Sequence, residues 1–128
     1  MQEFQFLGKR ATQPSKQLDT FPAPENVNLV KFESNELTSF CPVTGQPDFS
    51  TVTIEFSPEK LCIESKSLKL YLWSFRDEAL FAETLANKIA DDIFLAIQPL
   101  WCKVTLVQNI RGGLQLTVFA EKKKDNKI

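Results

Sequence analysis

The sequence predicts an α+β fold in which helices cover one face of an antiparallel sheet. Apolar and polar residues alternate over 49–57, as they do in a strand with one buried face. A helical repeat of apolar residues follows over 78–97, and strand patterns return at 101–107 and 114–120. This order of strands, helices and strands is typical of one sheet with helices packed on it. A length of 128 residues, 43% of them apolar, indicates a single domain with a core.

The first half of the chain is expected to hold an arm and three strands. Residues 1–26 are polar and contain three prolines, which favours an extended N-terminal arm. Alternation over 27–33 predicts the first strand. The segments 49–57 and 60–65 also fit strands, and the turn Ser57-Pro58-Glu59 between them predicts a hairpin.

Two helical segments are expected in the middle of the chain. Residues 67–76 fit both an alternating strand and a helical stripe, and we interpret them as the helical start of a longer region. Over 78–97 apolar residues recur at helical spacing, and Pro99 ends the pattern. The inward face of this helix is expected to comprise Leu80, Phe81, Leu85, Ile89, Ile93 and Ile97.

The C-terminal part is expected to complete the sheet. The strands at 101–107 and 114–120 are joined around NIRGG, whose glycines supply a turn or a bulge. The folded domain is therefore expected to span 27–120, followed by a charged tail in solvent at 121–128.

Composition excludes several function classes. Fifteen basic and sixteen acidic residues give a net charge of -1, so we expect no nucleic-acid partner bound through a broad basic face. The absence of histidine removes Ser-His and Cys-His catalysis within one chain, and without a CxxC pair no metal site is expected. Without an apolar run of membrane or signal-peptide length, and with free cysteines, the expected location is a reducing cytoplasm.

The segment SFCPVTGQPDF places a thiol and a carboxylate at the two ends of one tight loop. Cys41 is a candidate nucleophile, and Asp48 could take its proton and return it to a substrate. Alternatively, Cys41 is a small buried filler and Asp48 caps a turn; the sequence leaves both open. Cys62 and Cys102 lie inside strand patterns and are expected in the core.

Three further features could bind a ligand or lie idle in solvent. Lys66 and Lys69 of ESKSLK lie beside serines at a strand-to-helix junction, which suits phosphate as well as a solvated face. Arg111 on a glycine turn suits an anionic ligand or is a surface arginine. Glu83, on the flank of the helix, could accept paired N–H donors from a purine-like edge.

Taken in order and spacing, CPVTGQPDF, ESKSLKLY with SFR, F-x-E and IRGG closely resemble the NADPH-dependent 7-cyano-7-deazaguanine reductases of queuosine biosynthesis, the QueF family. The resemblance covers roughly residues 37–116 and is closest to the short, single-module form. It implies the tunnelling fold, with two helices on an antiparallel sheet. It also implies subunits joined into barrels with active sites between neighbours, and a homo-oligomer of two stacked pentamers.

The resemblance also implies roles for individual residues. A cysteine adds to the nitrile to form a thioimide, an aspartate acts as general acid and base, and two hydrides from NADPH give the primary amine. In this sequence the nucleophile corresponds to Cys41 and the acid/base to Asp48. The remaining residues are Glu83, which would hold the deazaguanine edge, Glu64 and Ser65 beside the substrate, and Lys66, Lys69 and Arg111 with the NADPH phosphates.

One departure from the family pattern bears on activity. The family usually has Phe-His-Glu where this chain has Phe81-Ala82-Glu83, and that histidine is associated with positioning substrate and protons. Covalent capture of the base is expected to persist, with impaired reduction. Two alternatives to a reductase are a binder that captures the base without reducing it, and an amidine-forming transferase acting on nitrile-bearing tRNA.

Overall fold

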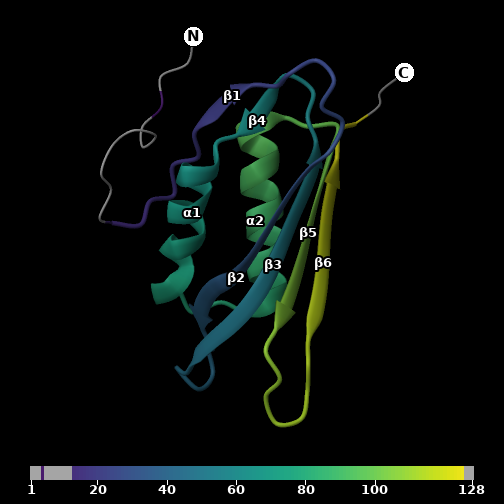
Figure 1. Ribbon diagram of the computed structural model, residues 1–128. Coiled ribbons are helices and arrows are strands. Elements are labelled where there is room, and N and C mark those ends of the chain that lie inside the picture. Colours follow the sequence, from purple (N-terminus) through teal and green to yellow (C-terminus); the bar gives the residue numbers. More distant parts are fainter. Residues whose placement is uncertain (1–3, 5–12, 126–128) are drawn as a thin grey trace.

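The computed structural model describes residue 4 and residues 13–125, which form a sheet with helices on one side (Figure 1). The main sheet is antiparallel and four-stranded, in the order β2 (Val30–Phe40), β3 (Pro47–Ser57), β5 (Trp101–Gln108) and β6 (Thr117–Lys123). A second, two-stranded sheet pairs β1 (Thr20–Pro22) with β4 (Leu61–Ile63). The helices are α1 (Ser65–Trp73), the short 3-10 helix η1 (Ser74–Asp77) and α2 (Ala82–Ile97). The expected α+β class is confirmed.

The strand β3 shows how the alternating pattern produces the sheet. Every second residue from Asp48 to Phe56 is buried, whereas most residues between them are more exposed. Successive side chains of a strand point to opposite faces, so the buried set faces the helices. Because β3 pairs with β2 on one edge and β5 on the other, both of its hydrogen-bonding edges are occupied.

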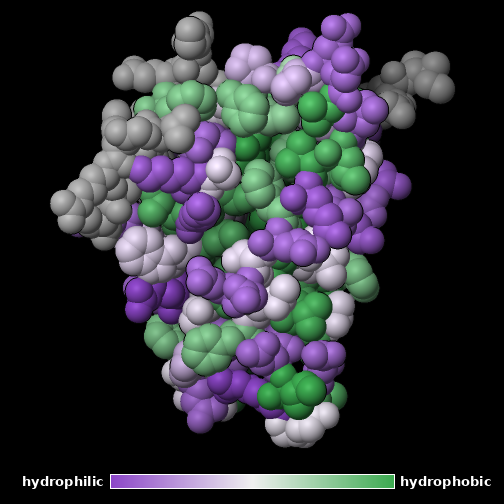
Figure 2. All heavy atoms as spheres, in the orientation of Figure 1, coloured by the Kyte–Doolittle hydropathy of each residue, from purple (hydrophilic) through white to green (hydrophobic). Residues whose placement is uncertain are grey.

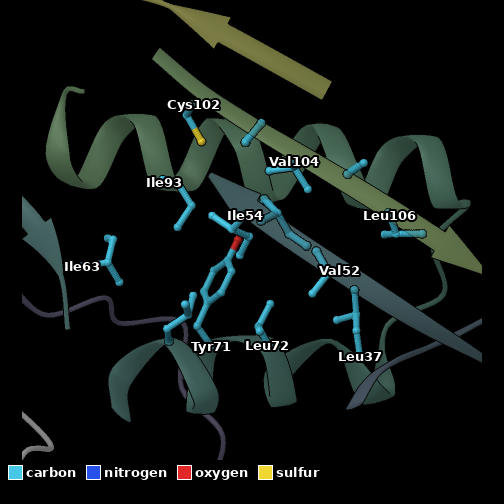
Figure 3. Packing of buried hydrophobic residues seen from close by; sticks show 14 of the residues in the cluster. Leu37, Val52, Ile54, Ile63, Tyr71, Leu72, Ile93, Cys102, Val104 and Leu106 are labelled. Carbon is cyan, nitrogen blue, oxygen red and sulfur yellow. The ribbon is translucent and has the colours of Figure 1, made fainter. Parts of the chain in front are cut away.

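The core lies between this sheet and the two helices. Tyr71 and Leu72 extend from α1 toward Ile54 and Val52, and Ile93 extends toward the sheet from α2 (Figure 3). The Tyr71 hydroxyl, at the end of a fully buried ring, donates a hydrogen bond to an Asp92 carboxylate oxygen at 2.6 Å. Burial of each such large side chain stabilises the fold by about 1.5–3 kcal/mol relative to exposure.

The cysteines expected in the core lie there. Cys62 of β4 and Cys102 of β5 are both buried. Burial raises the pKa of the Cys102 thiol to about 12 and also raises that of Cys62, because the charged thiolate loses its hydration. Both thiols therefore stay protonated and unreactive at neutral pH.

The expected hairpin over 49–65 is wrong. The strand β4 pairs with β1, with Phe21 opposite Cys62, and makes no pair with β3. Since both edges of β3 are occupied, the turn after Ser57 carries the chain into the second sheet. That sheet begins inside the segment expected to be an arm, and the Ala23 amide donates to the Lys60 carbonyl at 2.9 Å.

Two strands are displaced from their expected bounds. The strand predicted over 27–33 is Val30–Phe40, because pairing with β3 continues past a register shift between Ser34 and Leu37. This bulge interrupts the alternation that marks a strand in a sequence. The strand predicted over 114–120 is Thr117–Lys123, so its last residues belong to the segment expected to be a solvated tail. Those last residues are exposed.

The helices are close to expectation, with one correction. Residues 67–76 are helical, as predicted, within α1 and η1. The helix α2 begins at Ala82 instead of residue 78, and Phe81, expected to point inward, is 55% exposed. The preceding segment is extended and bridges to the end of β2 through Phe40. Among the helices of the described residues, none has the length and apolar character needed to cross a membrane.

Candidate active site

The β2–β3 and β5–β6 connections lie at one end of the sheet (Figure 1). A pocket of about 310 Å³ is lined by residues at this end and at the start of α2. Its lining includes Cys41 from the first connection, Asp48 from the start of β3, Ala82 and Glu83 from the helix, and Arg111 from the second connection. Residues distant in sequence therefore share one cavity. Four of the predicted site residues are among them: Cys41, Asp48, Glu83 and Arg111.

The loop that carries Cys41 is closed by its own backbone. Cys41 follows β2 directly; its amide donates to the Gln46 carbonyl and its carbonyl accepts from the Gly45 amide, both at 2.9 Å. Gly45 has a φ of 70°, a left-handed conformation that glycine adopts without steric cost. The pairing of Ser39 with Asp48 across β2 and β3 then fixes the two ends of the loop. This closure holds the thiol and the carboxylate at one pocket.

The surroundings of Cys41 favour its thiolate. The side chain is half-buried and lines the pocket, unlike the enclosed Cys62 and Cys102. The hydroxyl of Thr44 lowers the pKa of Cys41 most, followed by the backbone N–H groups of Thr44 and Val43, because hydrogen bonds to the charged sulfur stabilise it. The negative charge of Asp48 and partial burial oppose that shift. A thiol with a lowered pKa at an accessible site is suited to nucleophilic attack.

Arg111 connects the two loops. Its Nε lies 3.6 Å from an Asp48 carboxylate oxygen, and its Nη1 donates to the Gln46 side chain at 3.0 Å. The other terminal nitrogen donates to the Pro47 carbonyl. The glycines that follow, Gly112 and Gly113, have positive φ values and let the chain turn back at once. The structure thus places Arg111 against Asp48, whose side chain is only 11% exposed.

The first turn of α2 supplies the opposite wall. Ala82 is 2% exposed, and the Glu83 side chain is exposed and lines the pocket. Glu83 lies in the first turn of α2, where the backbone N–H groups favour an acidic side chain. A planar ligand in the pocket would have Cys41 on one side and Glu83 on another.

The other predicted residues form a second group around the start of α1. Glu64, 5% exposed, caps that helix: its carboxylate accepts from the amides of Lys66 and Ser67, both at 2.8 Å. Ser65 and Lys69 line a different pocket, of about 390 Å³, between α1 and the β2 bulge. Within one chain, neither Ser65 nor Lys69 lines the Cys41 pocket. Lys66 follows Ser65 in the first turn of α1.

Sequence reasoning missed several contributors to the Cys41 pocket, among them Thr44 and Gln108. Thr44 lies in the tight loop after Cys41, and its hydroxyl is the main group that stabilises the thiolate. Gln108, the last residue of β5, also lines the cavity, and no motif distinguishes it. A hydroxyl three residues after a loop cysteine is the one signal that could have identified Thr44.

The pocket is surrounded by exposed apolar side chains. Hydrophobic side chains gather over the β5–β6 connection at the lower end of the molecule in Figure 2. Ile110 and Leu114 of this connection are exposed, as are Val43 beside Cys41 and Phe81 before α2. Large exposed apolar patches commonly mark interaction sites, and these four side chains are candidates for such a contact.

Comparisons with known proteins agree on one family. Residues 47–127 match the family described as QueF-like protein. A protein of Syntrophus aciditrophicus is 48% identical over 120 residues, covering 92% of this chain and 85% of its own length. One of Halorhodospira halophila is 50% identical over 113 residues, covering 87% and 96%. Both are named NADPH-dependent 7-cyano-7-deazaguanine reductase.

A solved structure supports the fold independently. The archaeosine synthase QueF-Like in its apo form superposes with a TM-score of 0.71 at 24% identity, covering 77% of this chain and 97% of the other. This similarity confirms the expected tunnelling fold. Assembly into barrels stays a prediction.

Proposed function

This chain belongs to the QueF-like protein family, and we propose that it reduces the nitrile of 7-cyano-7-deazaguanine to an aminomethyl group with two molecules of NADPH. Similarity to the named reductases supports the reaction class. The observation that carries the proposal is the half-buried Cys41, with its lowered pKa, in one pocket with Asp48 and Glu83. A nitrile carbon is a soft electrophile, for which a thiolate is the suitable side-chain nucleophile.

In the first step Cys41 forms a covalent thioimide. Asp48 takes the thiol proton, and the sulfur attacks the nitrile carbon, so that a C–S bond forms as one C–N π bond breaks. The nitrogen receives the electron pair and the proton that Asp48 returns. Arg111, whose Nε lies 3.6 Å from an Asp48 carboxylate oxygen, would position this side chain for the proton transfers.

In the next steps the thioimide is reduced and released. NADPH, when bound, would supply the two hydrides that convert the former nitrile carbon first to the imine and then to the primary amine. Cys41 leaves as a thiolate when the C–S bond breaks, and Thr44 stabilises that leaving sulfur. Asp48 relays protons to the nitrogen.

The base and the cofactor would be held by different groups. Glu83 would accept two N–H donors of the deazaguanine edge, and charged hydrogen bonds of this kind contribute roughly 1.5–3 kcal/mol each. The start of α1 suits the phosphates of NADPH because Lys66 and Lys69 carry positive charge there, although Glu64 already binds the first helix amides. Ser65 and Lys69 line a pocket of about 390 Å³ there, and Glu64 would act by capping this helix.

Two measurements test the proposal. Mixed with the nitrile base without NADPH, the protein should gain the mass of one base per chain, and Cys41→Ala should gain none. With NADPH present, loss of its absorbance should follow the base concentration. An adduct that survives Cys41→Ala would show that another residue is the nucleophile. A protein that forms no adduct and oxidises no NADPH would contradict the proposed function.

A second candidate is a protein that captures the base covalently without reducing it. Ala82 favours this alternative, because it lines the pocket where the family usually has a histidine. An adduct formed at full occupancy with no consumption of NADPH would select this candidate over the reductase.

A further inference from the structure

We propose that Lys16 is a positioning residue for the Cys41 pocket, holding residues 78–80 so that Cys41 and Glu83 keep their spacing. This inference rests on the proposed function for its consequence in catalysis, but its structural claim can be tested separately. Lys16 lies in the N-terminal segment, outside the pocket itself. The evidence is a chain of contacts that runs from Lys16 to both walls of the pocket.

The ammonium group of Lys16 contacts several groups around η1. It forms an ion pair with the Glu78 carboxylate and donates to the Ser74 hydroxyl at 2.7 Å. It also lies 4.1 Å from the centre of the fully buried Phe75 ring, in a cation–π contact. The amide of Ser15 donates to the Leu70 carbonyl at 3.3 Å, which anchors this segment on α1. These contacts hold the Lys16 ammonium group beside Glu78.

Glu78 passes this restraint to the strand that carries the thiol. Its carbonyl accepts from the Phe40 amide at 2.9 Å, and the Phe40 carbonyl accepts from the Leu80 amide at 3.1 Å. Phe40 is the last residue of β2 and precedes Cys41 directly. Leu80 is separated only by Phe81 from the start of α2. Residues 78–80 therefore connect the two walls of the pocket through one isolated bridge.

The contacts of Lys16 favour a positioning role over a general role in stability. Both partners of its ion pair with Glu78 are more than a third exposed, and such pairs contribute little to global stability. Residues 78–80, however, lie outside the helices and the strands, and two backbone hydrogen bonds with Phe40 hold them to the end of β2. Loss of Lys16 is expected to loosen this local segment while leaving the core intact.

Hydrogen exchange tests the structural claim directly. In Lys16→Ala the amides of Phe40 and Leu80 should exchange faster by about tenfold or more, since local opening becomes easier. Lys16→Arg should restore most of the protection. A matched control is Lys124→Ala, which removes another half-exposed ion pair, with Glu59, and should leave both amides unchanged. Unchanged exchange in Lys16→Ala, or equal acceleration in Lys124→Ala, would overturn the proposal.

A chemical comparison tests the consequence for the site. Alkylation by iodoacetamide requires only the Cys41 thiol. Capture of the nitrile base requires in addition that Cys41 and Glu83 keep their spacing. Lys16→Ala should slow capture by about tenfold or more while alkylation and the melting temperature change little. If capture and melting temperature fall together, Lys16 is merely structural. If the wild-type protein captures no base, the proposed function is wrong. The hydrogen-exchange rates of Phe40 and Leu80 would still show whether Lys16 holds residues 78–80. If Lys16→Ala does not fold, Glu78→Gln replaces it in both assays.

Discussion

The reactivity of Cys41 depends on Thr44, which gives a prediction at the scale of one hydrogen bond. Thr44→Val keeps the shape of the side chain but removes the hydroxyl that lowers the pKa of Cys41 most. The pKa should therefore rise, and less thiolate should be present at neutral pH. Alkylation by iodoacetamide, followed against pH, should show its midpoint displaced to higher pH and a rate at pH 7 reduced severalfold.

Thr51→Val is the control for this prediction. It makes the same chemical change at an exposed position of β3, outside the residues that line the Cys41 pocket. Its pH profile should match that of the parent. A Thr44→Val profile that also matches the parent would mean that the backbone N–H groups of Val43 and Thr44 alone hold the thiolate.

Ala82 gives a second prediction at the residue scale. A positioned acid or orienting group contributes about 10²–10⁴-fold to a reaction rate, so without the usual histidine the thioimide should accumulate even with NADPH present. Ala82→His should raise turnover while adduct formation at saturating base changes little. Stopped-flow absorbance of the thioimide beside NADPH loss measures both steps. Unchanged turnover would leave Asp48 to carry the proton transfers alone.

Some residue-scale features of the pocket could be predicted from the sequence and others could not. The closeness of Cys41 and Asp48 follows from one short loop with prolines and a glycine, so local spacing was sufficient. The contact of Arg111 with Asp48 depends on β3 and β5 lying side by side, which sets their two connections at one end of the sheet. Local sequence motifs do not show that β3 and β5 are neighbours in the sheet.

At the scale of elements, the end of α2 offers a prediction about stability. Gln98 caps the helix with a φ of 47° and a ψ of 56°, a left-handed conformation that costs a residue with a Cβ about 1–2 kcal/mol. Gln98→Gly should raise the free energy of unfolding by about 1 kcal/mol, because glycine adopts this conformation freely but loses more chain entropy. Urea unfolding followed by circular dichroism measures the change.

A control on the same helix separates the effect of the left-handed cap conformation from the general effect of introducing a glycine. Asn87, also exposed, lies in the interior of α2. Asn87→Gly should lower stability by a few tenths of a kcal/mol, since glycine is the poorer helix former. If both glycine variants destabilise the protein, the left-handed cap is not the source of strain.

The wrongly predicted hairpin has one physical cause. The periodicity of a strand identifies its buried face but not its partner, which is why β4 was assigned to β3 instead of β1. The strand β1 has only three residues in a segment with prolines, too short for a pattern. Long segments with strong periodicity, such as α2 and β5, were located closely because their own residues determine them.

At the scale of the whole molecule, the candidate site residues form two separate groups. Cys41, Asp48, Glu83 and Arg111 share one pocket, while Ser65 and Lys69 line another. If both groups serve one reaction, they must meet between copies of the chain. The exposed apolar residues Val43, Ile110 and Leu114 beside the Cys41 pocket favour such contacts. We therefore expect an oligomer, for which light scattering at micromolar concentration is the first measurement.

Mixing inactive variants tests whether each site is shared between chains. Cys41→Ala lacks the nucleophile, and Lys69→Ala lacks a proposed cofactor contact, so each alone should be nearly inactive. In oligomers assembled from equal amounts of both variants, each site between two chains takes its thiol from one chain and its lysine from the neighbour. About a quarter of the sites then combine the intact Cys41 of a Lys69→Ala chain with the intact Lys69 of a Cys41→Ala chain. Activity should recover to about that fraction. The control pair, Cys41→Ala with Asp48→Asn, should recover nothing, because these residues line one pocket of a single chain. Recovery in the control pair, or none in the test pair, would show that the two groups do not meet across an interface as proposed.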